Sequence, residues 1–200
     1  MLPAAPPIAL ARPPPLALVV NHGNQATTTR MAAHRATSQP GRRRTIATRL
    51  SGVTSLPDWA RELDLSPHPE GGWYRETWRS DLTVTEAVLP TGYKGPRSAG
   101  TAILFLLMPG QESAWHTVRS CELWLHHFGG PLLLEIGAEQ DTATTHLLGP
   151  DILAGEQPQI LVPPGDWQRA RPRDDQPCLV SCVVVPGFDF ADFALAAPTD

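Results

Sequence analysis

The sequence predicts an all-β domain that begins with a short helix and follows a disordered N-terminal extension. Short apolar runs rich in β-branched and aromatic residues recur between residues 72 and 185, separated by clusters of Pro and Gly. That region contains no apolar-periodic run long enough for an ordinary helix. The 200 residues are 42% hydrophobic, which suffices for one soluble core. Many short strands at this spacing indicate a β-sandwich or barrel.

Residues 1–50 differ from the rest of the chain. They contain seven Arg and no Asp or Glu, with a Pro-rich start, "LPAAPPIALARPPP". Such a segment buries too little apolar surface to offset its ordering entropy, so we expect a disordered extension. An Arg-rich, acid-free, Thr-containing segment also fits an organellar transit peptide. A start codon assigned too early, with Met31 as the later start, is the third interpretation. We place the globular domain at residues 51–200.

The charge of the globular part limits the choice of partners. Residues 51–200 carry a formal charge of −11, so a nucleic-acid partner is not expected. No apolar run approaches the roughly 18 residues of a membrane span, so no membrane partner is expected. Cys121, Cys178 and Cys182 are odd in number and form no CxxC motif, which is typical of reduced core thiols. We expect a cytoplasmic protein, or an organellar one if residues 1–50 are a transit peptide.

The elements can be assigned in order from residue 55. "SLPDWARELDL" predicts a short helix over residues 55–65, with Pro57 near its first turn, and "SPHPEGG" ends it. "PGFDFADFAL" predicts a final turn or short helix packed onto the barrel by its three Phe. The predicted strands are Gly72–Arg79, Thr101–Met108, Ser113–Arg119, Glu122–Phe128, Leu132–Ile136, Thr142–Leu148, Gln159–Val162, Gln168–Arg171 and Leu179–Val185.

The stretch "GQESAWHTVRSCELWLHHFGG", residues 110–130, holds the strongest candidates for chemistry. Side chains alternate along a strand, so residues of even number share one face if the turn keeps parity. That face would carry His116, Val118, Glu122, Trp124 and His126. A mixed polar and aromatic face is unusual for a core and typical of a ligand cavity.

This stretch resembles the first motif of the cupin superfamily. The matching positions are Gly110, His116, Glu122 and Gly129, and Val118 stands where the motif has a second His. In "VPPGDWQRA", Pro163, Gly165 and Gln168 resemble the second motif, with Gln168 in place of its His. "LSPHPEGGWYRETWRS" and "SCVVVPGFDFADFAL" extend the resemblance, over roughly residues 56–195, to one uncharacterised branch of the RmlC-like cupins.

The resemblance implies a double-stranded β-helix barrel (the cupin or jelly-roll barrel), usually a homodimer, with a ligand cavity inside. Metal-binding cupins generally supply three His and one Glu, and two of those His positions are empty here. A divalent metal, if bound, would be held by His116, Glu122 and Gln168. We expect instead a cavity without a metal, in which His116 and Glu122 form a hydrogen-bonded pair.

The expected function is that of a small-molecule-binding cupin. RmlC-like epimerases work without a metal, so the resemblance favours a metal-independent isomerase or epimerase acting on a carbohydrate or nucleotide-sugar-like ligand. His116 would be the base and Glu122 its orienting partner. Two alternatives stay open: a divalent-metal isomerase or dioxygenase with a reduced ligand set, and a non-catalytic binding or storage-like module.

Further ligand-binding candidates surround this pair. Arg75 could hold an anionic group and Gln168 could donate a hydrogen bond. Arg75 and Glu76 lie on opposite faces of their strand, and the sequence leaves open which face points inward. The remaining candidates are His68, Glu76, Trp115, Trp124 and His126. Each also has a structural interpretation: the Trp residues as core or interface, His68 as part of a turn, and Arg75 with Glu76 as an ion pair.

Overall fold

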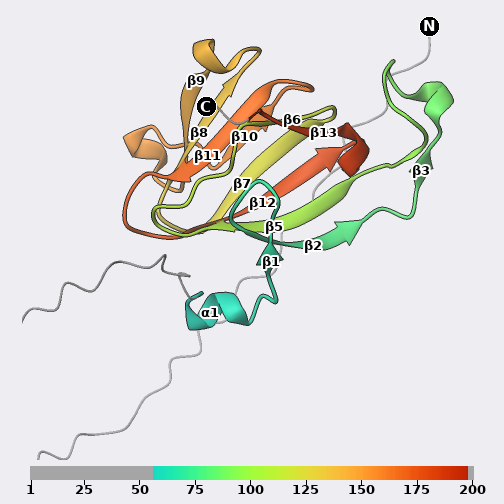
Figure 1. Cartoon of the computed structure of the whole chain (residues 1–200). Helices are drawn as coiled ribbons and strands as arrows, with labels where there is room; N and C mark the ends of the chain where they lie inside the picture. Colours follow the sequence, from blue (N-terminus) through green and yellow to red (C-terminus); the bar gives the residue numbers. More distant parts are fainter. Residues whose placement is uncertain (1–55, 198–200) are drawn as a thin grey trace, which may run out of the picture. The chain divides into compact units, whose positions relative to one another are not determined.

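A computed structural model describes residues 56–197 of the protein, and the expectations for residues 1–50 fall outside that range. Two antiparallel sheets face each other and form a jelly-roll barrel (Figure 1). The larger sheet has the strand order β1 (Ser66–Pro67), β2 (Trp73–Arg79), β5 (Thr101–Leu107), β12 (Cys178–Val185), β7 (Cys121–Gly129), β10 (Gln159–Val162). The smaller sheet has the order β13 (Phe193–Leu195), β6 (His116–Val118), β11 (Trp167–Pro172), β8 (Leu132–Gly137), β9 (Thr144–Leu148).

The remaining elements are short. β3 (Thr83–Val84) pairs with β4 (Arg97–Ser98) as a separate two-stranded ribbon. The one α-helix of the described residues is α1 (Asp58–Arg61). The 3₁₀ turns are η1 (Glu86–Val88), η2 (Gln140–Thr142), η3 (Ile152–Ala154) and η4 (Phe190–Asp192). Between residues 56 and 197, no helix combines the length and the apolar character needed to cross a membrane.

The predicted all-β class, the jelly-roll barrel and the short N-terminal helix are confirmed, and each predicted strand has a counterpart. The helix is shorter than residues 55–65. The amides of Leu63 and Asp64 already bond three residues back, and Asp64 has a φ of 51°, which ends the helical turn. The sequence prediction missed β1, β3 and β4, each only two residues long, and β13, where a turn or helix was expected.

The core lies between the two sheets. The alternating burial of β8 shows the period-two pattern that a half-buried strand requires. The largest buried apolar side chains of the core are Trp124, Phe105, Leu107, Leu132, Leu134, Leu148, Val162 and Val180. His116 and Gln168 are also almost fully buried, at 2% and 0% exposed. Buried polar side chains need hydrogen-bond partners, so His116 and Gln168 indicate a functional site at their end of the core.

The outer face of the larger sheet is apolar over much of its area. Helix α1 covers one part of it, with Ala60 packed on Leu106 and Leu179. The register places half-buried Leu104, Leu123, Leu125 and Val183 on this same face, together with Leu161, which is 57% exposed. No described residue covers Leu161. A self-complementary apolar face of this kind fits a two-fold dimer.

We therefore expect a homodimer through this face, and Leu161→Arg should weaken it. The two-fold axis would bring two unpaired guanidinium groups into one apolar interface, so dissociation should rise at least about a hundredfold. Analytical ultracentrifugation measures this directly. Leu153→Arg is the matched control, because Leu153 is fully exposed on η3. A wild-type protein that is monomeric at every concentration would contradict the expectation.

Candidate functional site

A cavity of about 330 Å³ opens between the two sheets. Its floor is polar and its walls are aromatic and aliphatic. The lining comes from β2, β5, β6, β7, β12, the turn before β2 and the segment around η4. The lining residues are His68, Glu70, Tyr74, Glu76, Arg79, Thr101, Ile103, His116, Val118, Glu122, Cys182, Val184, Phe188, Asp189, Phe190 and Phe193. The size lies at the lower end of the range for small-molecule sites.

Three residues predicted to share one face do line this cavity: His116, Val118 and Glu122. His116 is placed by pairing of β6 with Gln168 of β11 in the smaller sheet. Glu122 is placed by pairing of β7 with Val184 of β12 in the larger sheet. The two side chains therefore reach the cavity from opposite walls.

The expected hydrogen bond between His116 and Glu122 is wrong. The His116 Nδ1 atom lies 2.8 Å from the carbonyl oxygen of Ala114, which is an acceptor. Nδ1 must therefore carry the proton and Nε2 the lone pair in the neutral ring. That Nε2 lies 3.3 Å from Oε2 of Glu70, a residue that the sequence prediction did not single out.

Glu70 reaches the cavity because the segment "HPEGG" forms a tight turn between β1 and β2. The His68 amide donates to the Gly72 carbonyl, and the Gly71 amide donates to the His68 carbonyl. Gly71 has a φ of +106°, which only glycine adopts readily. The Glu70 carbonyl accepts the Ala114 amide, which ties the turn to the segment entering β6. The turn thus places Glu70 next to His116.

His68 contacts the same carboxylate oxygen from the other side. Its Nδ1 lies 3.5 Å from Glu70 Oε2, and it also accepts the Glu70 backbone amide at 3.4 Å. Nδ1 of His68 therefore carries a lone pair as well. The Glu70 oxygen thus lies between two nitrogen lone pairs, an arrangement that is stable only if a proton is held among the three groups.

Burial explains which group holds that proton. Desolvation, together with the charge of Glu122, raises the pKa of Glu70 well above 4.5. Desolvation lowers the pKa of His116 from 6.5 to about 4, and it lowers the pKa of His68 to about 4. At neutral pH both imidazoles are uncharged, and of the three groups Glu70 is the one whose protonated form is favoured by burial.

Glu122 has its own partner, Gln168. The Gln168 Nε2 donates to Glu122 Oε2 at 2.6 Å, and the Trp124 Nε1 donates to Gln168 Oε1 at 2.9 Å. Burial raises the pKa of Glu122, whereas the bonds from Gln168 and Cys182 act in the opposite direction. Gln168 therefore does not line the cavity but orients Glu122, and its two amide atoms are already used.

A bulge in β2 decides which side chains reach the cavity mouth. Glu76 pairs with Ile103, but the next pair is Trp78 with Ala102, so one extra residue is inserted. Because of this insertion Arg79, and not Trp78, follows Glu76 on the inner face. Arg79 donates to both carboxylate oxygens of Glu76, at 2.7 and 3.0 Å.

The prediction of Arg75 as an anion holder is wrong, because Arg75 is exposed and does not line the cavity. It neighbours Tyr74 and Glu76 on the strand and therefore points to the outer face. Glu76 does line the cavity, as a partner of Arg79. His68 also lines the cavity, with its ring edge-on to Tyr74 at 4.5 Å between centroids.

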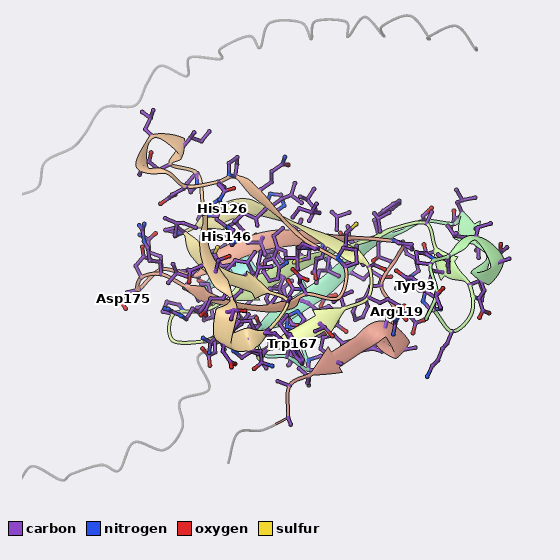
Figure 2. All side chains as sticks on the ribbon, turned by 90° about the horizontal axis from the view of Figure 1, so that it is seen from above. Tyr93, Arg119, His126, His146, Trp167 and Asp175 are labelled. Carbon is purple, nitrogen blue, oxygen red and sulfur yellow. The ribbon has the colours of Figure 1, made fainter. Side chains whose placement is uncertain are left out.

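Three other candidates lie outside the cavity. Trp124 is a core residue, 1% exposed, and packs edge-on against Phe105. Trp115 directly precedes β6 and lies beneath the guanidinium of Arg169, 4.9 Å from the ring centroid. His126 has the predicted inward parity but lies four residues beyond Glu122, about 13 Å along the strand. Its Nε2 bonds the Gly130 carbonyl, far from the end of the barrel that carries Tyr93 and Arg119 (Figure 2).

The side chains predicted to hold a divalent metal offer too few donor atoms for it. Such a site generally takes three or more protein ligands. Val118 has no donor atom, and Gln168 is committed to Trp124 and Glu122. Within residues 56–197 no group of three or more His, Cys, Asp and Glu side chains is arranged to hold a metal ion. The expected set of His116, Glu122 and Gln168 therefore does not fit a metal centre.

Sequence comparison identifies relatives of the whole domain. Residues 57–196 match the family described as Cupin superfamily (DUF985). A solved structure from Shewanella oneidensis is 37% identical, with a TM-score of 0.61, over 70% of this chain and 83% of that one. A hypothetical protein from Leishmania major is 35% identical, with a TM-score of 0.59, over 69% of this chain and 85% of that one. The search of curated proteins finds no match to the chain.

Proposed function

Because the chain belongs to the DUF985 family of the cupin superfamily, we propose that its barrel cavity binds a small polar molecule and acts on it by general acid–base catalysis. The reaction class is that of an isomerase or epimerase. The observation that carries this proposal is the Glu70 carboxyl, held between the lone pairs of His116 and His68 on the cavity floor. It keeps an exchangeable proton in a desolvated site next to bound ligand.

The second requirement of such a reaction is a proton acceptor, and Glu122 supplies it. Glu122 reaches the cavity from the larger sheet, whereas His116 reaches it from the smaller sheet. Burial raises the pKa of both carboxyl groups, but the Gln168 amide opposes this rise at Glu122, and the charge of Glu122 adds to the rise at Glu70, so Glu122 is the carboxyl that releases its proton more readily. One acid and one carboxylate in a single cavity are the parts that a proton transfer between neighbouring atoms of a ligand needs.

The charged side chains that line the cavity limit the kind of ligand it can bind. The lining carries the carboxyl groups of Glu70, Glu76, Glu122 and Asp189, and its one guanidinium, Arg79, is already held by Glu76. A diphosphate group would need an unpaired cation. We therefore propose an uncharged, sugar-sized ligand rather than a nucleotide sugar, with aromatic rings such as Phe188 and Phe193 as its apolar contacts.

We further propose that catalysis requires no metal, because the groups facing the ligand are used as acid and base.

Exchange of a carbon-bound hydrogen with D₂O tests the function. Aldoses and ketoses are incubated with the protein, and proton NMR follows the loss of the signal next to the carbonyl group. We expect exchange with at least one sugar in the presence of a chelator. His116→Ala and Glu122→Gln should each slow this exchange by about 10²–10⁴-fold.

His127→Ala is the matched control, because His127 is exposed and bonds Ser181 outside the cavity. Circular dichroism and thermal melting check that each variant folds. Unchanged exchange in His116→Ala would contradict the acid–base role. Saturable sugar binding without exchange would identify a non-catalytic binding module instead. Stoichiometric Fe, Mn, Ni or Zn in active protein, with activity lost to the chelator, would contradict the metal-independent mechanism.

A further inference from the structure

A second cleft, of about 420 Å³, shares only Phe193 with the lining of the cavity described above. Residues 90–93, the turn between β6 and β7, the loop before β11 and the segment from η4 to β13 form its walls. Much of the wall is apolar, including Pro164, Val185 and Pro186. Two charged residues line it, Arg119 and Asp192.

Two arginines contact the buried carboxylate of Asp192 at this cleft. Asp192 is buried, and Arg97 binds both of its oxygens, Nε to Oδ2 at 2.7 Å and Nη2 to Oδ1 at 3.1 Å. The Arg97 Nη1 is used by the carbonyl oxygens of residues 94–96. Arg119 approaches the same carboxylate with its Nε, at 3.4 Å from Oδ1. Two guanidinium groups thus contact the Asp192 carboxylate, and the charge of Asp189 acts on Arg97 as well.

The free donors belong to Arg119. No hydrogen bond from its two terminal nitrogens to any residue between 56 and 197 is found. Its guanidinium lies over the ring of Tyr93, 5.8 Å from the centroid, in the region where Figure 2 labels both residues. Gly92 allows this position, since a Cβ there would lie 2.5 Å from Arg119 Nη1. The planar donor fork therefore lies at the cleft without an acceptor among residues 56–197.

A second, independent observation also points to an acceptor. Tyr93 and Ser120 are 7% and 2% exposed, and their hydroxyl oxygens lie 2.8 Å apart. Two hydroxyl groups carry two protons, and this contact uses only one of them, whichever group donates. The other proton has no acceptor among the described residues, and both side chains line the cleft. A buried donor of this kind is costly unless a ligand oxygen accepts it.

From these two observations we propose that the cleft binds a small organic carboxylate, with its two oxygens on the Arg119 fork and the Tyr93–Ser120 hydroxyl pair, and its apolar body against Pro164, Val185 and Pro186. Guanidinium groups bind carboxylates through two parallel hydrogen bonds, and the planar fork is already oriented here by Tyr93. The site is independent of the acid–base cavity and of any reaction there.

Benzoate is the probe, and benzamide, which has the same shape without the charge, is the matched ligand. The full chain is labelled with ¹⁵N, and amide shifts are followed during titration. We expect saturable benzoate shifts at Gly92, Thr117 and Gly165, with a dissociation constant on the order of 1 mM. Arg119→Gln should weaken benzoate binding at least about tenfold, and benzamide should bind at least about tenfold more weakly than benzoate.

Arg75→Gln is the control variant, since Arg75 is exposed and lies outside the cleft. Arg119→Lys keeps the charge but not the planar fork and should fall between wild type and Arg119→Gln. The Arg119 side chain is 43% exposed, so its replacement should leave the melting temperature nearly unchanged. Equal benzoate affinity in wild type and Arg119→Gln, equal affinity for benzamide, or shifts confined to the acid–base cavity would overturn the proposal.

Discussion

Replacing Gln168 by Ala is expected to lower the free energy of unfolding by about 3–5 kcal/mol. Gln168 is fully buried and connects two other buried groups, the Trp124 indole and the Glu122 carboxyl. Its removal leaves one donor and one acceptor unsatisfied and also opens a void. Urea denaturation at neutral pH measures the change. Gln159→Ala is the matched control, because Gln159 is exposed on β10, and it should shift the value by less than about 0.5 kcal/mol.

Gln168→Met separates the two causes, because Met fills nearly the same volume without hydrogen bonds. If the lost hydrogen bonds account for most of the effect, Gln168→Met should lower the free energy of unfolding nearly as much as Gln168→Ala does. A Met variant as stable as wild type would contradict the role assigned to the amide. The bond from Gln168 lowers the pKa of Glu122, so removing it should also raise the pKa of that carboxyl further.

Glu70→Gln is expected to change the dependence of stability on pH. Burial and the charge of Glu122 raise the pKa of Glu70 well above its ordinary 4.5 in the folded protein. Above pH 4.5 the unfolded chain releases this proton and the folded protein keeps it, so wild-type stability falls as the pH rises toward the folded pKa. Gln cannot ionise. The variant should therefore gain stability relative to wild type as the pH rises above 4.5, by up to about 1.4 kcal/mol per pH unit, until the pH reaches the folded pKa of Glu70.

The imidazoles act with the opposite sign. His68 and His116 have a folded pKa of about 4, below the ordinary 6.5, so their contribution falls as the pH drops from 6.5 toward 4. This contribution is common to both proteins and largely cancels in the difference between them. Glu76→Gln is the control, since Glu76 is exposed at the mouth. Parallel stability curves for wild type and Glu70→Gln would show that Glu70 is not protonated in the folded state.

The sequence predicted the all-β barrel because alternation and turn residues are local signals. It also predicted that His116 and Glu122 both point inward, and both do line the cavity, but from opposite walls, because β6 and β7 belong to different sheets. It paired them wrongly because the partners come from distant segments: Glu70 lies 46 residues before His116 in the chain, and Gln168 lies 46 after Glu122. No strand period predicts contacts of that kind.

Two further errors have different causes. His126 points inward as predicted, but it lies too far along β7 to reach the cavity. Strand periodicity predicts the face on which a side chain lies and not its position along the barrel. Arg79 was missed because a bulge in β2 changes the face on which it lies. The glycines of "HPEGG" were a usable signal, since paired glycines between two strands indicate a tight turn that can present its other side chains to a cavity.

The bulge at residues 76–78 has a consequence for how this site can vary among related proteins. With regular pairing, Trp78 would take the inner position that Arg79 now holds, and the mouth would change from an ion pair to an aromatic ring. A single-residue insertion or deletion in β2 would thus alter which ligands enter, with every neighbouring residue kept. Substrate preference in this family can therefore change through the length of one strand, and alignments that place a gap there wrongly would conceal it.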